Sequence, residues 1–138
     1  MSPAGYSGTS LAKKLGIKAG FRIELINAPD YYMDLFGNEL PSNLDFSADA
    51  DQKKDMIHFF TRSSLDYKEF LPLLKQQINH NGMIWVSWPK KTSGLKSDIS
   101  ENQIRNLAIE SGLVDVKVCA IDEIWSGLKL VIPVKDRK

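Results

Sequence analysis

Two stretches of sequence decide the fold, MIHFFT at residues 56–61 and MIWVSW at residues 83–88. Each is a short and almost continuous apolar run, which is typical of a strand buried on both faces. Between them, residues 63–78 carry apolar side chains at helical spacing, with an interruption at Pro72 that predicts a kink or a restarted helix. A strand, a helix and a second strand in this order form a parallel unit, so we expect the two strands to lie side by side and to point the same way.

Similar patterns continue outward from this unit in both directions. We predict further strands at residues 21–28, 44–46, 114–121 and 128–134. We predict helices at residues 11–15 and 31–36, and a third helix that begins at the capping box of residues 100–103 and ends at Gly112. The polar residues 79–82 are expected to end the central helix. Only residues 122–127 separate the last two strands, too few for a helical crossover, so that pair must be antiparallel.

The alternation of buried strands with helices predicts an α/β fold, a three-layer Rossmann-like arrangement with a mainly parallel sheet and a terminal antiparallel edge strand. The chain has 138 residues, enough for one domain with its own core but not for two. We therefore expect a single α/β domain over residues 1–138, with a flexible N-terminus at residues 1–8 and a flexible tail at residues 135–138.

The net charge argues against one broad class of function. The chain carries 18 basic and 17 acidic residues, a net charge of +1, whereas general polyanion binders have a large basic excess. The charges are unevenly distributed, because seven carboxylates lie within residues 30–55 and the remainder is net basic. The simplest interpretation is a pair of solvated faces of opposite sign.

Cysteine usage and apolar length exclude further classes. Cys119 is the only cysteine, which excludes an intramolecular disulfide and a cysteine-based zinc site. No apolar run reaches the roughly 18 residues that a membrane span needs, and the sequence contains no signal-peptide pattern. We therefore expect a cytoplasmic protein with no membrane partner.

The carboxyl ends of parallel strands meet at one edge of a sheet, and ligands of open α/β sheets bind beyond that edge. We call it the carboxyl edge. Polar or aromatic side chains follow each predicted strand there: Asn27, Asp30 and Tyr31; Thr61, Arg62 and Ser63; Trp88, Lys90, Lys91, Thr92 and Ser93; and Asp122, Glu123, Trp125 and Ser126. We expect all four groups to share the carboxyl edge.

Three basic side chains in this set, Arg62, Lys90 and Lys91, predict a cationic site for a small ligand that carries phosphate or carboxylate. The helix start at residues 63–64 supports the prediction, because N–H groups at a helix start also favour anions. The alternative is structural, with both lysines paired to the carboxylates at residues 122–123 and merely tying two loops together. The predicted ligand-binding residues are Asn27, Arg62, Trp88, Lys90, Lys91 and Trp125, of which the asparagine and the tryptophans would shape the pocket.

Patterns for catalysis and cofactor binding are missing from the sequence. A dinucleotide-binding turn needs G-x-G-x-x-G, but Asn-Ala-Pro at residues 27–29 follows the first long strand. There is no Walker sequence and no G-x-S-x-G elbow. His58 lies inside an apolar run, where a satisfied core histidine is the simplest interpretation, and His80 lies in a polar turn. We name no catalytic residue, no metal site and no cofactor, and we favour a non-catalytic protein.

Five blocks of the sequence resemble a bacterial family classed as a domain of unknown function. They are GYSG at residues 5–8, LAKKLGI at 11–17, WVSWPKK at 85–91, GLVDVKV at 112–118 and DEIWSGLKLV at 122–131. The resemblance extends over nearly the whole chain, so it supports the predicted fold. It implies no chemistry, because none is assigned to the family.

A weaker resemblance is to the fold of class I S-adenosylmethionine-dependent methyltransferases. NGMIW at residues 81–85 resembles the turn and the start of the fifth strand of that fold, and the closing antiparallel pair resembles its last two strands. Residues 27–29 depart from it, because those enzymes have a glycine-rich loop there that cradles the methionine and the ribose. The chain is also short for such an enzyme and has no recognisable substrate lid. Fold similarity alone does not transfer activity.

We therefore favour a non-catalytic or degenerate Rossmann-like module that binds a small anionic ligand or a protein partner at the carboxyl edge. One alternative is an enzyme related to methyltransferases that binds its nucleoside in an altered way. Another is weak nucleic-acid binding through Trp88 and the loop at Lys90–Lys96, which the near-zero net charge disfavours. A homodimer formed through the last strand, residues 128–134, is a further hypothesis.

Overall fold

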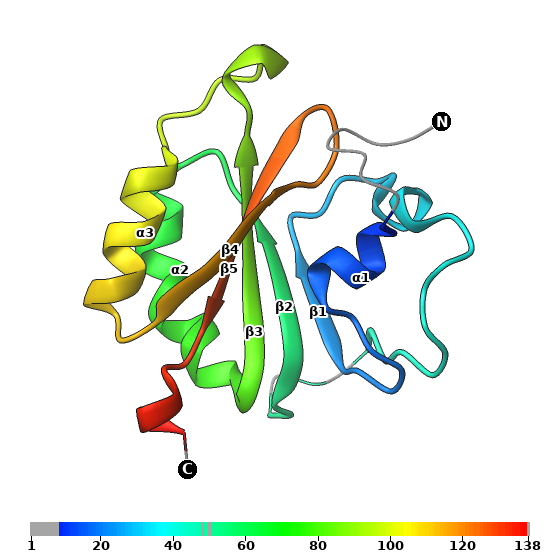
Figure 1. The fold of residues 1–138 in the computed structure, drawn as a ribbon. Helices are drawn as coiled ribbons and strands as arrows, with labels where there is room; N and C mark the ends of the chain where they lie inside the picture. Colours follow the sequence, from blue (N-terminus) through cyan, green and yellow to red (C-terminus); the bar gives the residue numbers. More distant parts are fainter. Residues whose placement is uncertain (1–8, 48, 50, 138) are drawn as a thin grey trace.

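The computed structural model describes residues 9–47, 49 and 51–137. The predicted flexible N-terminus at residues 1–8 lies outside the described residues, as does position 138 of the predicted tail. The elements follow one another in this order: α1 (Leu11–Leu15), β1 (Ile23–Ile26), η1 (Tyr32–Phe36), β2 (Lys54–Phe60), α2 (Ser64–Gln77), β3 (Ile78–Pro89), η2 (Lys91–Ser93), α3 (Glu101–Glu110), β4 (Val114–Ala120), β5 (Trp125–Val131) and η3 (Val134–Asp136). This is the alternation that the apolar pattern predicts (Figure 1).

Residues 44–46 and 79–82 form other structures than the sequence predicts. In place of a strand at residues 44–46, the chain forms only an isolated bridge between Arg22 and Asp45. Residues 79–82, predicted to end the central helix, belong instead to β3. One of their polar side chains finds a partner there, since Asn79 donates its side-chain amide to Asp55 Oδ1 at 2.9 Å.

The strands of the described chain form one sheet in the order β1-β2-β3-β5-β4. The two stretches that decide the fold are adjacent and parallel, with Met56 opposite Met83 and Phe60 opposite Ser87. β1 is parallel to β2, and β5 pairs antiparallel with β3 and β4. The Rossmann-like α/β fold and the antiparallel last pair are therefore confirmed.

The predicted position of the antiparallel strand is wrong. β5 lies inside the sheet, and β4 occupies the edge. Burial explains this order, because Leu128 and Leu130 of β5 are fully buried whereas Val116 and Val118 of β4 are about half exposed. β5 is hydrogen-bonded on both sides, so it lacks the free edge on which the homodimer hypothesis for residues 128–134 relies.

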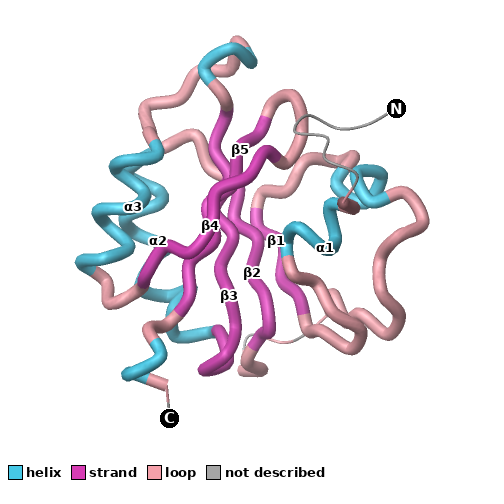
Figure 2. The backbone as a smooth tube through the Cα atoms, in the orientation of Figure 1, coloured by secondary structure: helices cyan, strands magenta, loops and turns pink. Residues whose placement is uncertain are grey.

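The sheet is the middle of three layers, with α2 and α3 packed on one face and α1 on the other (Figures 1 and 2). Side chains alternate between the two faces along each strand. In β2, Ile57 and Phe59 join the core beneath α2 and α3, whereas Met56 and Phe60 join the core beneath α1. Both faces of β2 are thus covered, which explains its continuous apolar run.

α2 and α3 begin at serines that the sequence predicts. The Ser63 hydroxyl accepts a hydrogen bond from the Asp66 amide at 3.2 Å, and Ser100 and Gln103 form a reciprocal capping box. α2 continues through Pro72 as one helix, so the predicted restart does not occur. Both helices start at the carboxyl edge of the sheet (Figure 1).

Candidate functional site

The loop between β3 and α3, residues 90–99, lies beyond the carboxyl edge of the sheet and is fastened to the start of α2 (Figure 1). Arg62 donates Nε to the Lys96 carbonyl at 2.7 Å, and the Asp98 amide donates to the Arg62 carbonyl at 3.1 Å. These bonds join residues that are far apart in sequence. They make the loop one wall of a cleft.

The carboxylate of Asp98 occupies the N-terminus of α2. Its Oδ1 accepts a hydrogen bond from the Ser64 amide at 2.7 Å, while the Ser63 hydroxyl caps the same turn. A helix start attracts an anion, and here the chain itself supplies one. The anion-binding role predicted for residues 63–64 is thus taken by an internal carboxylate.

The loop and the sheet edge border a cleft of about 870 Å³. Its charged lining residues are Arg62, Lys90, Lys91, Lys96 and Asp98. The single acid among them is already bonded to the start of α2. The cleft is therefore cationic, because four basic side chains line it against one carboxylate.

A second cleft, of about 490 Å³, adjoins the first and shares Lys90 and Lys91 with it. Trp88 lines this second cleft from the end of β3. The one acid in its lining, Glu101, pairs with Arg105 at 2.7 Å. The two clefts therefore meet at Lys90 and Lys91. The acidic residue of each cleft, Asp98 or Glu101, is bonded to a group other than these lysines. We call them the paired clefts.

The alternative ion pairs from the lysines to residues 122–123 are not formed. Asp122 Oδ1 instead accepts hydrogen bonds from the amides of Ile124 and Trp125, at 2.8 and 2.7 Å. The two loops are joined through their backbones, since the Lys90 amide donates to the Ile124 carbonyl at 2.7 Å. Within the described part of the chain, neither Lys90 nor Lys91 has a carboxylate partner.

Two of the six predicted binding residues line neither of the paired clefts. Asn27, at a positive φ of 59°, donates Nδ2 to the Phe60 carbonyl at 3.3 Å and so links the ends of β1 and β2. Trp125 is buried, and its ring packs edge-on against Phe60 at a centroid distance of 5.1 Å. The other four predicted residues each line one cleft or both.

Residues 95–100 complete the larger cleft, and no motif in the sequence marks them as site residues. The basic character of residues 90–96 is the one signal that points to this loop. Its position depends on hydrogen bonds from Arg62 and Ser64, more than 30 residues away in sequence, which no local pattern predicts.

His58 is the satisfied core histidine that the apolar run predicts. Its Nδ1 lies 2.9 Å from the Tyr32 hydroxyl and its Nε2 lies 2.8 Å from the Ser87 hydroxyl, and all three side chains are buried. Burial lowers the pKa of His58 to about 3, so the ring is neutral near pH 7. Ser87 and His58 stand at the distance of a nucleophile and its base, but both are fully buried and neither lines the paired clefts.

The described residues contain neither a metal-binding cluster nor a membrane-spanning helix. In the described part of the chain, no three histidine, cysteine, aspartate or glutamate side chains gather closely enough to hold a metal ion. None of the helices there is both long and apolar enough to cross a membrane. The thiol of Cys119 is free, and burial raises its pKa.

Solved structures of methyltransferases share this fold. A SAM-dependent methyltransferase from Aquifex aeolicus is 13% identical, with a TM-score of 0.65 over 89% of this chain and 88% of that one. A putative methyltransferase from Thermoplasma acidophilum is 9% identical, with a TM-score of 0.58 over 86% of this chain and 71% of that one. A ribosomal protein L11 methylase from Lactobacillus delbrueckii subsp. bulgaricus is 12% identical, with a TM-score of 0.58 over 88% and 74%. At such low identity the likeness concerns the fold alone.

The family is shown by a match over most of the sequence. No curated protein matches the chain. The model of the family described as "Protein of unknown function (DUF3052)" matches residues 12–134, a range that includes every strand of the sheet. The resemblance to a domain of unknown function is thereby confirmed, although the block at residues 5–8 lies outside both the matched range and the described residues. The chain belongs to the DUF3052 family.

Proposed function

We propose that the domain binds a small anionic ligand in the paired clefts at its carboxyl edge. The observation that carries this proposal is that Lys90 and Lys91 line both clefts and have no carboxylate partner among the described residues. A concave site lined by one sign of charge focuses its field and concentrates ions of the opposite sign. An external anion is therefore the expected counterion.

Two further groups support an anion with several oxygen atoms. Arg62 uses Nε for the Lys96 carbonyl, which leaves its two terminal nitrogens without a partner among the described residues. A guanidinium presents its donors as a planar fork that suits phosphate or carboxylate. Lys96 adds a fourth cationic side chain to the lining of the same cleft.

The size and walls of the clefts suit an organic anion. The larger cleft, of about 870 Å³, lies within the range of roughly 300–1,000 Å³ that is typical of small-molecule sites. Trp88, although 8% exposed, forms an apolar wall of the smaller cleft against which a ring or a hydrocarbon group can pack. An organic phosphate or an organic acid combines these features.

Isothermal titration calorimetry with phosphate, pyrophosphate and citrate tests the proposal. Removing both shared charges in Lys90→Ala/Lys91→Ala should weaken binding at least about tenfold, because a hydrogen bond to a charged group contributes roughly 1.5–3 kcal/mol. Lys68→Ala is the matched control, since Lys68 is exposed on α2 and lines neither cleft. Equal binding by the wild type and the double variant, or no binding of any of these anions, would refute the proposal.

A second candidate is a methyltransferase-like enzyme that binds its nucleoside in an altered way. The observation in its favour is the fold similarity to the Aquifex aeolicus enzyme, with a TM-score of 0.65. The main difference to overcome is the turn after β1, where Asn27 bonds to the Phe60 carbonyl and no glycine-rich loop is present. Calorimetry with S-adenosylmethionine and S-adenosylhomocysteine decides the matter, because the absence of binding at millimolar ligand excludes this candidate.

Nucleic-acid binding through the loop at residues 90–96 would use the same two lysines. A phosphate backbone binds with a steep dependence on salt. A gel shift with an oligonucleotide tests this candidate. Binding that weakens steeply with salt and is lost in Lys90→Ala/Lys91→Ala would identify a nucleic acid, rather than a small molecule, as the ligand.

A further inference from the structure

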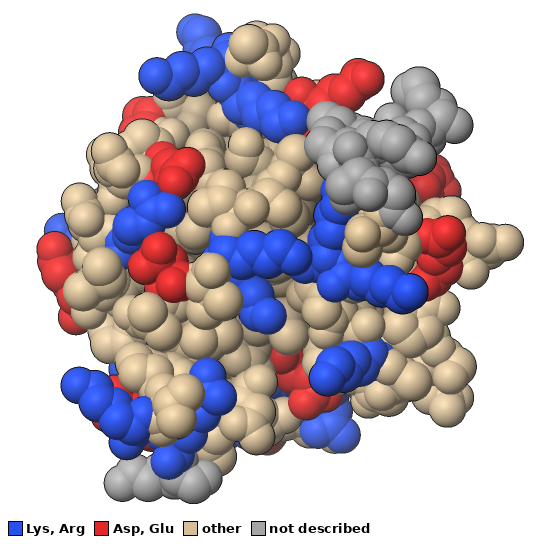
Figure 3. Space-filling view, in the orientation of Figure 1, with Lys and Arg blue, Asp and Glu red and all other residues tan. Residues whose placement is uncertain are grey.

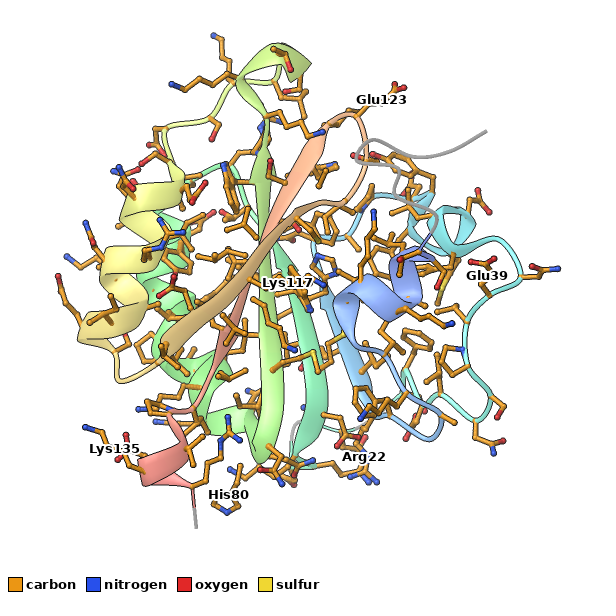
Figure 4. The ribbon with its side chains drawn as sticks, in the orientation of Figure 1. Arg22, Glu39, His80, Lys117, Glu123 and Lys135 are labelled. Carbon is orange, nitrogen blue, oxygen red and sulfur yellow. The ribbon has the colours of Figure 1, made fainter. Side chains whose placement is uncertain are left out.

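A second group of basic side chains lies over the middle of the sheet, on the face that α1 covers. It consists of Lys18, Lys117 and Lys129, which come from the loop after α1, from β4 and from β5, and we call it the lysine face. Basic side chains extend across this side of the molecule in Figure 3, and Figure 4 shows Lys117 over the centre of the sheet. None of the three lines the paired clefts, so this surface is independent of the site proposed above.

Lys117 and Lys129 are direct neighbours across two strands. They occupy opposite positions in the antiparallel register between β4 and β5. Side chains that are directly opposite project from the same face of a sheet, and like charges in such a pair are destabilising. The fold therefore keeps an unfavourable pair at this position.

The surroundings add positive charge to this pair. Burial and then the charges of Lys117 and Lys18 lower the pKa of Lys129. Its amine lies close to the end of α1, 3.6 Å from the place that a Cβ on Gly16 would occupy. Among the ion pairs formed by described residues, none includes a lysine of the lysine face. No described acid compensates the repulsion.

One amine of the lysine face is already held in position. Lys117 donates Nζ to the Lys14 carbonyl at 2.9 Å, so its side chain crosses from β4 to the last turn of α1. That turn also carries the basic residue Lys13. A side chain that is ordered before binding loses less conformational entropy when a ligand arrives.

We propose that the lysine face binds a compact anion that carries several phosphate charges. Such a ligand would place its negative charge between Lys117 and Lys129 and relieve their repulsion. The β4 residues on the same face as Lys117 are Val114, opposite Val131, and Cys119, opposite Gly127, and neither offers a ring on which a base could stack. This composition favours a free polyphosphate-type ligand over a nucleic acid.

An NMR titration with inorganic triphosphate tests this site separately from the paired clefts, because each amide reports its own surroundings. The amide signals of Gly16, Lys117 and Lys129 should shift along one binding curve. In Lys129→Met, which keeps an apolar stem and removes the charge, that curve should weaken at least about tenfold while the curve of the cleft amides stays unchanged. The control Lys68→Met should leave both curves unchanged.

Stability provides a second readout for the same variants. Because the lysine pair is unfavourable in the free protein, Lys129→Met should raise the Tm of the ligand-free protein by about 1–4 °C. Lys18→Gln, at an exposed position, should weaken the triphosphate curve in the same direction. Unchanged triphosphate curves in both variants, or an oligonucleotide that binds this face when triphosphate does not, would overturn the proposal.

Discussion

The Nε of Arg62 lies 2.7 Å from the carbonyl oxygen of Lys96 and donates a hydrogen bond to it. This contact ties the loop after β3 to the start of α2. The Asp98 amide returns a bond to the Arg62 carbonyl at 3.1 Å, so the two segments hold each other. The shape of the larger cleft depends on this loop staying in place.

Replacing Arg62 with alanine should loosen the loop at residues 90–98 without unfolding the sheet. Arg62 is exposed, so the free energy of unfolding should change little. The loop, however, loses a charge-assisted bond, and its amide protons should exchange with solvent faster by about tenfold or more. Hydrogen exchange followed by NMR measures the difference.

Arg62→Lys is the matched control, because it keeps the charge and removes the Nε donor. If the directed bond holds the loop, exchange should be fast in both variants. Loop amides that exchange in Arg62→Ala as slowly as in the wild type would contradict the assignment.

The buried His58 should make stability depend on pH in one direction. Its pKa is about 3 in the folded protein, against 6.5 for an ordinary histidine. Below pH 6.5 the unfolded chain takes up a proton that the folded chain does not, so the free energy of unfolding should fall as the pH is lowered toward 3. The slope from this residue is at most about 1.4 kcal/mol per pH unit. Above pH 6.5 its contribution is constant.

Urea unfolding between about pH 5 and pH 7 measures this slope, above the range in which most carboxylates titrate. His58→Gln should flatten the profile. His80→Gln is the control and should keep the wild-type slope, because His80 is exposed. A wild-type profile that is level over this range would contradict the lowered pKa of His58 in the folded protein.

Gly127 of β5 leaves no room for a side chain. A Cβ at this position would lie 2.9 Å from Ile121 Cδ1 and 3.1 Å from Trp85 Cε3. Overpacking a filled core typically costs about 1–3 kcal/mol, so Gly127→Ala should lower the free energy of unfolding by that amount. Urea unfolding measures it, with Ser126→Ala in the same strand as the control. Equal stability of the two variants would contradict this prediction, because it would mean that the core rearranges to accept one methyl group at no cost.

The candidate site was predictable only in part. Lys90 and Lys91 could be found because they directly follow a strand whose direction the apolar pattern predicts. Asn27 and Trp125 follow strands at the same edge, yet one forms a turn and the other packs in the core. Position along the chain brings a residue to the carboxyl edge, but packing decides whether its side chain faces a cleft.

The sequence by itself determined the parallel pairing of residues 56–61 with 83–88 and the helix starts at Ser63 and Ser100, because apolar runs and caps act between near neighbours. Only the tertiary structure decided that β5 lies between β3 and β4, and that Asp98 occupies the start of α2. The strand order depends on which of the two last strands is buried on both faces. The second contact depends on which anion lies next to the amides at the start of α2. In both cases the residues that come into contact are distant in sequence, so no local pattern predicts the contact.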